Sequence, residues 1–205
     1  MRWAEFKDIV KRGAGRGTCP HQLAFLLECG LRRFVLSPER LAERLELEDT
    51  SRVLELGPGP GYFSRAVACR IPQGFLLLVD LQREMLQKAR GKLARAGLRN
   101  VGFVQANAAV LPVPSGACDC VFLVAVLGEV SDPESCLREI YRVLRPGGLL
   151  SLTEQPGDPD FVALPDARSL VEGAGFRFEK VYGRGKNYTA SFRSTGSPRK
   201  IFEPL

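Results

Sequence analysis

The chain has 205 residues, of which 45% are hydrophobic and 25% charged, and its formal net charge is +6. This length predicts one domain, and the composition excludes collagen-like and disordered chains. No apolar run approaches the roughly 18 residues that a membrane-spanning helix needs. The first residues also lack the apolar core of a signal peptide. We therefore expect a cytoplasmic protein with reduced cysteines and no transmembrane segment.

Three regions follow one another along the chain. Residues 1–50 have apolar residues at helical spacing, and Ser37 before Pro38 has the form of a helix start. We expect this region to form a helical cover. Residues 51–193 are predicted to form the main domain, and residues 194–205, rich in Pro, Ser and Gly, a loose tail.

In the main domain, apolar runs of strand length alternate with helical segments. The predicted strands are Val53–Leu56, Phe75–Val79, Val101–Gln105, Cys120–Ala125, Leu149–Thr153, Phe176–Val181 and Tyr188–Phe192. The predicted helices are Tyr62–Arg70, Met85–Ala96, Pro133–Leu144 and Asp166–Glu172. Strands that are apolar on both faces and separated by helices indicate an α/β fold with a mostly parallel, helix-covered sheet. The last two strands are candidates for antiparallel neighbours.

A glycine-rich turn follows the first predicted strand. Gly57, Gly59 and Gly61 precede a predicted helix, and such a turn lets the backbone approach a ligand closely. The glycine spacing fits the dinucleotide pattern G-x-G-x-x-G poorly. Glu55, two residues before the first glycine, would repel a pyrophosphate but suits a ligand with an ammonium group.

A second acid, Asp80, ends the second predicted strand. An acid in this place can accept hydrogen bonds from a ribose diol. An adenosine-like ribose at Asp80 and a positive group near Glu55 match S-adenosylmethionine, which carries both.

Five stretches in order resemble the motifs of class I S-adenosylmethionine-dependent methyltransferases, including the quinone-biosynthesis C-methyltransferases. They are Glu55–Gly61, Leu78–Leu86, Gln105–Pro114, Asp119–Leu127 and Leu137–Gly148. The resemblance implies a Rossmann-like class I methyltransferase fold: a seven-stranded, mostly parallel sheet with helices on both faces and an N-terminal helical cover. It also implies methyl transfer from S-adenosyl-L-methionine, with S-adenosyl-L-homocysteine as the product.

The resemblance assigns residues to the methionine end of the cofactor. Gly57, Gly59 and Gly61 would cradle the methionine and ribose portion, Glu55 would orient the methionine end, and Val124 would touch it. Taken alone, the glycines are equally typical of an ordinary tight turn.

The resemblance also assigns residues to the adenosine end. Asp80 would bind the ribose hydroxyls, and Leu81 would pack on adenine. Asn107 would hydrogen-bond the adenine amino group, and the Ala108 N–H would reach a ring nitrogen. Singly, Asp80 is also compatible with a helix N-cap and Asn107 with a turn.

Candidates for the acceptor side follow the fourth and fifth predicted strands. Glu129 and Glu154 are potential bases or ligands for a cationic acceptor, although surface and packing roles compete. Tyr62 and His21, the only histidine, are candidate substrate contacts, and a structural role is favoured for the histidine. No residue spacing suggests a metal site.

The predicted partner is a small-molecule methyl acceptor, and a homodimer is possible. The residues Leu127–Val130 depart from the usual Leu-Arg-Asn-Val of the quinone C-methyltransferases. Two alternatives stay open: a cofactor-binding subunit without catalysis, and an RNA or protein methyltransferase. Residues 83–99 hold six Lys or Arg and one acid, but a solvated helix face explains this charge better than a nucleic-acid surface.

Overall fold

The computed structural model describes residues 36–196. Its helices are α4 (Pro38–Arg44), α5 (Ser64–Arg70), α6 (Arg83–Arg95), α7 (Pro133–Val143) and α8 (Leu164–Gly173), with a 3-10 helix η2 (Leu127–Glu129). Its strands are β1 (Arg52–Leu56), β2 (Phe75–Asp80), β3 (Val101–Gln105), β4 (Cys118–Val124), β5 (Leu144–Glu154), β6 (Phe176–Arg184) and β7 (Asn187–Ser194). Every helix and strand predicted for the main domain is present.

The strands form one seven-stranded sheet in the order β3-β2-β1-β4-β5-β7-β6. The pairs β1–β2, β1–β4, β2–β3 and β4–β5 are parallel. Among the described strands, β7 alone runs opposite to the other six, so its pairs with β5 and β6 are antiparallel. The predicted mostly parallel sheet and the antiparallel final pair are therefore confirmed. The strand order reverses between β1 and β4, the position where ligands bind in open α/β sheets.

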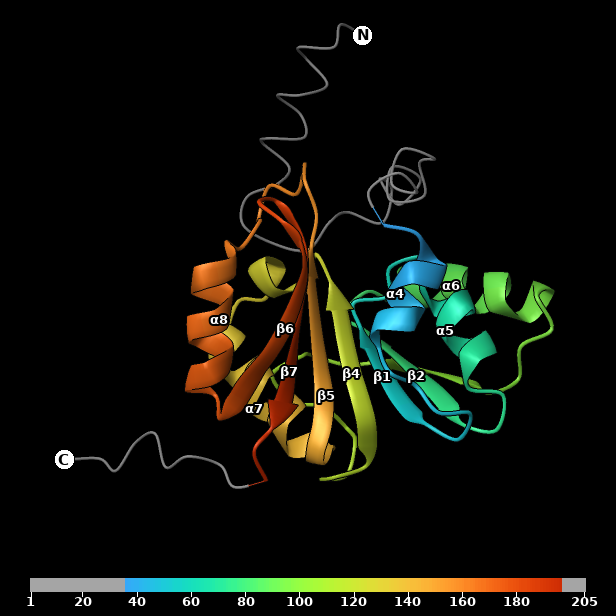
Figure 1. Cartoon of the computed structure of the whole chain (residues 1–205). Helices are drawn as coiled ribbons and strands as arrows, with labels where there is room; N and C mark the ends of the chain where they lie inside the picture. Colours follow the sequence, from blue (N-terminus) through green and yellow to red (C-terminus); the bar gives the residue numbers. More distant parts are fainter. Residues whose placement is uncertain (1–35, 197–205) are drawn as a thin grey trace, which may run out of the picture.

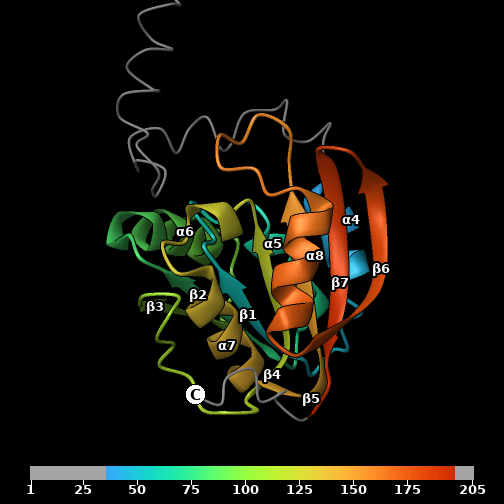
Figure 2. The same cartoon turned by 90° about the vertical axis from the view of Figure 1, so that its left-hand side faces the viewer.

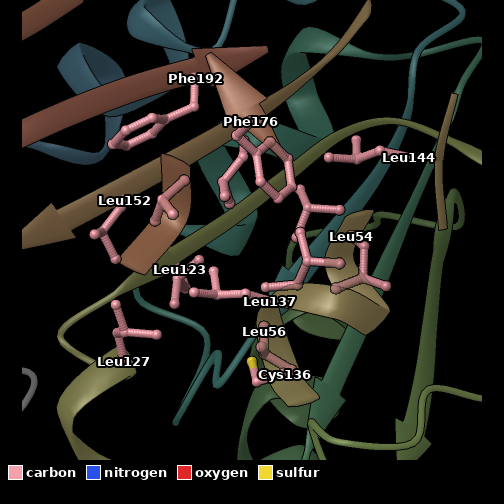
Figure 3. Packing of buried hydrophobic residues seen from close by; sticks show 14 of the residues in the cluster. Leu54, Leu56, Leu123, Leu127, Cys136, Leu137, Leu144, Leu152, Phe176 and Phe192 are labelled. Carbon is pink, nitrogen blue, oxygen red and sulfur yellow. The ribbon is translucent and has the colours of Figure 1, made fainter. Parts of the chain in front are cut away.

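Helices cover both faces of this sheet (Figure 1). On one face, α7 and α8 bury an apolar cluster that includes Leu54, Leu123 and Leu137, part of which is drawn in Figure 3. On the other face, α4, α5 and α6 bury a second cluster around Phe122 and Leu78. Because successive strand residues point to opposite faces, strands apolar on both sides supply both clusters at once.

Several predicted boundaries differ from the observed ones by a few residues, and two of these differences have a clear local reason. The helix predicted from Tyr62 begins at Ser64, because residues 61–63 are still part of the turn after the glycines. The fifth strand was expected from Leu149, but it begins at Leu144, which pairs with Cys118. A register shift between Cys118 and Cys120 takes up the extra residues of the Pro-Gly-Gly segment.

The described part of the predicted N-terminal cover is α4. Ser37 caps it as expected, accepting a hydrogen bond from the Arg40 N–H at 3.2 Å. At its other end, the Arg44 guanidinium donates to the Thr189 hydroxyl of β7 at 2.8 Å. This hydrogen bond connects α4 to β7. The rest of the cover, with His21, and most of the predicted tail lie outside the described residues.

We expect Leu123→Ala to lower the free energy of unfolding by about 2–5 kcal/mol, the usual cost of a cavity in a packed core. Leu123 lies at the centre of the α7/α8 cluster and is 1% exposed. Urea denaturation measures the change. Val110→Ala is the control, because Val110 is 72% exposed, and its effect should stay within about 0.5 kcal/mol. Equal effects of the two substitutions would contradict this account of the core.

Candidate functional site

The carboxyl ends of four parallel strands meet at one edge of the sheet. Leu56, the last residue of β1, is in register with Val79 of β2 and Leu123 of β4. The chain then leaves β1 through the glycine turn, whose first N–H, that of Gly57, donates to the Val79 carbonyl at 2.8 Å. Consequently, side chains at the ends of β1, β2, β4 and β5 share one region of the molecule.

The three glycines of the turn have positive φ angles: 65° at Gly57, 54° at Gly59 and 78° at Gly61. Side chains rarely tolerate this conformation. At Gly57 a Cβ would also lie 2.5 Å from Cγ2 of Val126, in the loop after β4. At Gly61 it would lie 3.0 Å from the Ala89 Cβ of α6. Gly57 thus lets the turn pack against the β4 loop, and Gly61 lets it pack against a helix.

Glu55 of β1 is buried beneath this turn and is 3% exposed. The Ser64 hydroxyl, in the first turn of α5, donates to its Oε2 at 2.5 Å. Burial raises the pKa of Glu55 to about 8; the Ser64 hydrogen bond opposes this shift and the neighbouring Asp80 adds to it. The free protein therefore holds a largely protonated carboxyl here at neutral pH. Sequence analysis did not identify Ser64 as the partner of Glu55.

Asp80, the last residue of β2, lies between the glycine turn and α6. Its Oδ2 accepts from the Gly59 N–H at 3.3 Å, and its Oδ1 accepts from the Gln82 N–H at 2.8 Å. Burial raises its pKa, while these backbone hydrogen bonds act in the opposite direction. Next to it, Leu81 is 54% exposed. A buried hydrogen-bonding carboxylate thus adjoins an exposed apolar side chain.

Asn107 follows β3 and joins the same edge. The carbonyl of Asp80 accepts from the Ala106 N–H at 3.1 Å, which holds the chain after β3 next to the end of β2. Asn107 is exposed, and its Oδ1 accepts from the Ala109 N–H at 2.9 Å. The turn role considered for Asn107 is therefore present. Ala108, beside it, is half-buried.

After β4, the backbone bends in a strained conformation. Val124 ends β4, and Ala125 has φ 55°, in the left-handed region that favours glycine. The Ala125 N–H donates to the Thr153 carbonyl of β5 at 2.8 Å. After this bend the chain enters η2, which ends at Glu129. Non-glycine residues in this conformation cluster at functional sites.

Glu154, the last residue of β5, is fully buried, so the surface role that competed for it in the sequence is wrong. Its Oε2 accepts from the Val162 N–H at 3.4 Å, and its Oε1 has no hydrogen-bond partner among the described residues. Burial raises the pKa of Glu154 to about 8, and Asp158 and Glu129 raise it further. Glu129 is thus near enough to act on Glu154, and the acceptor role of the two residues stays a prediction.

Tyr188 of β7 completes this second group and was missed from the sequence. It pairs with Glu154 across the strands, and its hydroxyl donates to the Val162 carbonyl at 2.8 Å. Burial raises its pKa, with Glu154 adding to the shift. By contrast, Tyr62 lies in the turn before α5, half-buried, with its ring at an edge-to-face distance of 4.8 Å from Phe63. The Tyr62 substrate contact stays a prediction.

Residues 36–196 contain neither a metal-binding cluster nor a membrane-spanning helix. No three His, Cys, Asp or Glu side chains of this part of the chain are grouped to hold a metal ion. No helix within it is long and apolar enough to cross a membrane.

Comparisons with known proteins agree with this geometry. Residues 54–152 match the family model described as Methyltransferase domain. The chain is 41% identical over 135 residues to the ubiquinone/menaquinone biosynthesis C-methyltransferase UbiE of Hahella chejuensis, an alignment that covers 58% of this chain and 53% of that protein. The chain spans about half the length of the curated relatives it matches.

Solved structures share the fold. A SAM-dependent methyltransferase from Aquifex aeolicus superposes with a TM-score of 0.79 at 23% identity, covering 86% of this chain and 98% of that one. The [4+2]-cyclase SpnF superposes with a TM-score of 0.69 at 20% identity, covering 76% and 80%. The fold is thus the Rossmann-like fold of class I methyltransferases, as predicted. Residues 54–152 of the chain are similar to the methyltransferase domain family.

The raised pKa of Glu55 predicts a pH-dependent stability. Between its ordinary value and about 8, the folded protein keeps the Glu55 proton and the unfolded chain loses it, so raising the pH favours unfolding. We expect Glu55→Gln to flatten this decline and to stabilise the free protein by a few kcal/mol above pH 8. Urea denaturation from pH 5.5 to 8.5 measures the free energy of unfolding of the wild type and of Glu55→Gln.

Glu154 contributes a decline of the same sign, so some pH dependence should remain in Glu55→Gln. Glu84→Gln, at an exposed position of α6, is the control and should follow the wild-type curve. If Glu55→Gln also ran parallel to the wild type, the buried protonated carboxyl would be refuted.

Proposed function

We propose that this protein is a methyltransferase that transfers a methyl group from S-adenosylmethionine to a small-molecule acceptor. The observation that carries the proposal is the placement of two buried carboxyls, Glu55 and Asp80, at the ends of adjacent parallel strands around one glycine turn. The family match over residues 54–152 supports the same activity. The role in ubiquinone and menaquinone biosynthesis that the relatives' names state is a property of those proteins.

The adenosine half of the cofactor fits the groups around Asp80. This carboxylate is already oriented by two backbone N–H groups, those of Gly59 and Gln82. Its remaining acceptor capacity suits a ribose diol. Exposed Leu81 offers an apolar surface to adenine, and Asn107 with the Ala108 N–H would bind the edge of the base.

The methionine half fits the groups around Glu55. A buried carboxyl without a cationic partner among the groups that set its pKa suits a ligand with positive charge. The same carboxyl would repel a pyrophosphate, which argues against a nicotinamide dinucleotide. Gly57 lies close to Val126, and these two residues would line the methionine half of the cofactor with Gly59, Gly61 and Val124. We call these five residues the cofactor wall.

When bound, S-adenosylmethionine supplies a methyl group on a positively charged sulfur. The chain's own residues then align the acceptor and exclude water, which are the main requirements of an in-line displacement. Glu129 and Glu154, beyond the ends of β4 and β5, are our candidates for holding the acceptor or accepting its proton. Burial raises the pKa of Glu154, and such perturbed acids are typical of functional sites.

We expect the folded protein to bind S-adenosylmethionine and S-adenosylhomocysteine, and not NADH, in a calorimetric titration. Asp80→Ala should weaken the binding of both by about 1–3 kcal/mol, or roughly 5–150-fold in Kd, because a charge-assisted hydrogen bond is lost. Asp49→Ala, at an exposed position distant in the fold from the glycine turn, should bind like the wild type. Wild-type affinity in folded Asp80→Ala would refute the ribose assignment, and binding of NADH alone would refute the cofactor.

A further inference from the structure

The segment that joins β3 to β4, residues 106–117, contains no helix or strand. Near its start are Asn107 and Ala108, the residues proposed above for the edge of adenine. Long connections without regular structure are usually either functional or disordered. This segment passes alongside α7 on its way from β3 to β4 (Figure 2). The contacts that hold it against α7 therefore bear on the placement of the base-binding residues.

Two charged side chains of α7, Glu139 and Arg142, supply these contacts. They form a bidentate ion pair, in which Nε of Arg142 donates to Oε1 of Glu139 and Nη2 donates to Oε2, each at 2.7 Å. A forked pair of this kind is stronger and more specific in its geometry than a single hydrogen bond. The hydrogen bond from Arg142 also lowers the pKa of Glu139, so the pair stays ionised at neutral pH. We call these two residues the α7 ion pair.

The α7 ion pair binds both backbone groups of Leu111. The Leu111 N–H donates to Oε2 of Glu139 at 2.7 Å, and the Leu111 carbonyl accepts from Nη2 of Arg142 at 2.9 Å. The remaining guanidinium nitrogen, Nη1, donates to the Val113 carbonyl at 2.8 Å and to the Ser115 hydroxyl at 3.3 Å. Side chains thus provide the hydrogen bonds that a neighbouring strand provides to a regular segment.

Two turns connect this anchored part of the segment to Asn107. The Val110 N–H donates to the Asn107 carbonyl at 3.0 Å, and the Ala109 N–H donates to the Asn107 Oδ1 at 2.9 Å. A second lone pair of Oδ1 stays available for a ligand. On its other side the segment is hydrogen-bonded to the end of β2. Asn107 is therefore held from two directions, by β2 before it and by α7 after it.

Apolar burial anchors the same segment in a less specific way. Leu111 and Val113 are 3% and 9% exposed and pack in the α7/α8 cluster. Apolar contacts are not directional, so they keep the segment on the protein without orienting its N–H and carbonyl groups. Loss of the α7 ion pair should consequently leave a folded protein in which the base-binding residues are poorly placed.

We propose that Glu139 and Arg142 are positioning residues for the cofactor, which act through Leu111 to hold Asn107 and Ala108 where these two residues read the edge of adenine. The inference rests on the proposed binding of S-adenosylmethionine and adds the residues that determine its base specificity. Neither Glu139 nor Arg142 belongs to the cofactor wall or touches the base in this proposal.

The test compares two ligands that differ only in the base. S-adenosylhomocysteine carries adenine, whereas S-inosylhomocysteine carries hypoxanthine, which has a carbonyl in place of the amino group and an N–H in place of the adjacent ring nitrogen. A site built to hydrogen-bond one of these edges binds the other more weakly. In calorimetric titrations of the full chain, we expect the wild type to bind the adenine ligand at least about tenfold more tightly.

Arg142→Met keeps the apolar stem of Arg142 without its donors, and it should reduce this preference to about threefold or less. Arg142→Lys keeps the charge but not the fork, so it should also reduce the preference, and it provides the test if the methionine variant does not fold. Arg138→Met is the matched control, because Arg138 lies on the same helix and bonds to Glu134 and Ser135 of that helix. This control should keep the wild-type preference.

Hydrogen exchange gives a second readout that needs no ligand. Because Glu139 accepts from the Leu111 N–H, this amide should exchange about tenfold faster in Arg142→Met than in the wild type. It should exchange at the wild-type rate in Arg138→Met. An unchanged exchange rate in Arg142→Met would show that the α7 ion pair does not hold the segment, and the proposal would be wrong.

The outcomes separate this inference from the proposed function. If the wild type binds neither ligand, the proposed function fails and this inference fails with it. If the wild type binds both ligands equally, cofactor binding stands but Asn107 and Ala108 do not read the base, so the inference is wrong. A folded Arg142→Met or Arg142→Lys that keeps the full preference for adenine also overturns it, even if both ligands bind more weakly, because a purely structural role would weaken the two alike.

Discussion

The structure depends above all on the parallel pairing of β1 with β2 and β4. Parallel hydrogen bonding in register forces the three strands to end at one edge. Strand pairing by itself therefore holds residues that are distant in sequence, such as Glu55 and Asp80, close together. The two apolar clusters on either face keep the strands in place. Groups at the carboxyl ends of these strands consequently lie near one another.

The glycine turn makes the position of the loop after β4 depend on the end of β1. Gly57 must lack a side chain because Val126 packs against it, and Val126 follows the strained Ala125 that bends the chain after β4. The positions of the β1 turn and the β4 loop are thus mutually dependent. A change in one shifts the other, because close-packed interiors transmit displacement. The loop after β4 therefore contacts both the glycine turn, through Val126, and the end of β5, through Ala125.

Most of the fold was predictable because its signals are local. Apolar runs, glycine breaks and the Ser37–Pro38 helix start each act within a few residues. The remaining features depend on contacts between distant segments. The start of β5 at Leu144 follows from a partner in β4, and the burial of Gly61 follows from Ala89 of α6. Likewise, Tyr188 joined the site only through its antiparallel pairing with Glu154, and no pattern near Tyr188 indicated it.

Burial has the same effect on two acids that lie on opposite faces of the sheet. Glu55 faces the α5 side and Glu154 the α7/α8 side, and burial raises the pKa of each to about 8. An apolar residue in either place would give a more stable free protein, because ionising a buried carboxyl is costly. Retaining an acid there makes sense when a positive ligand offsets the cost on binding. On this argument, the proposed sulfonium cofactor would offset the cost of the acid at Glu55, and the protein gives up stability in the free state to select a positively charged ligand there.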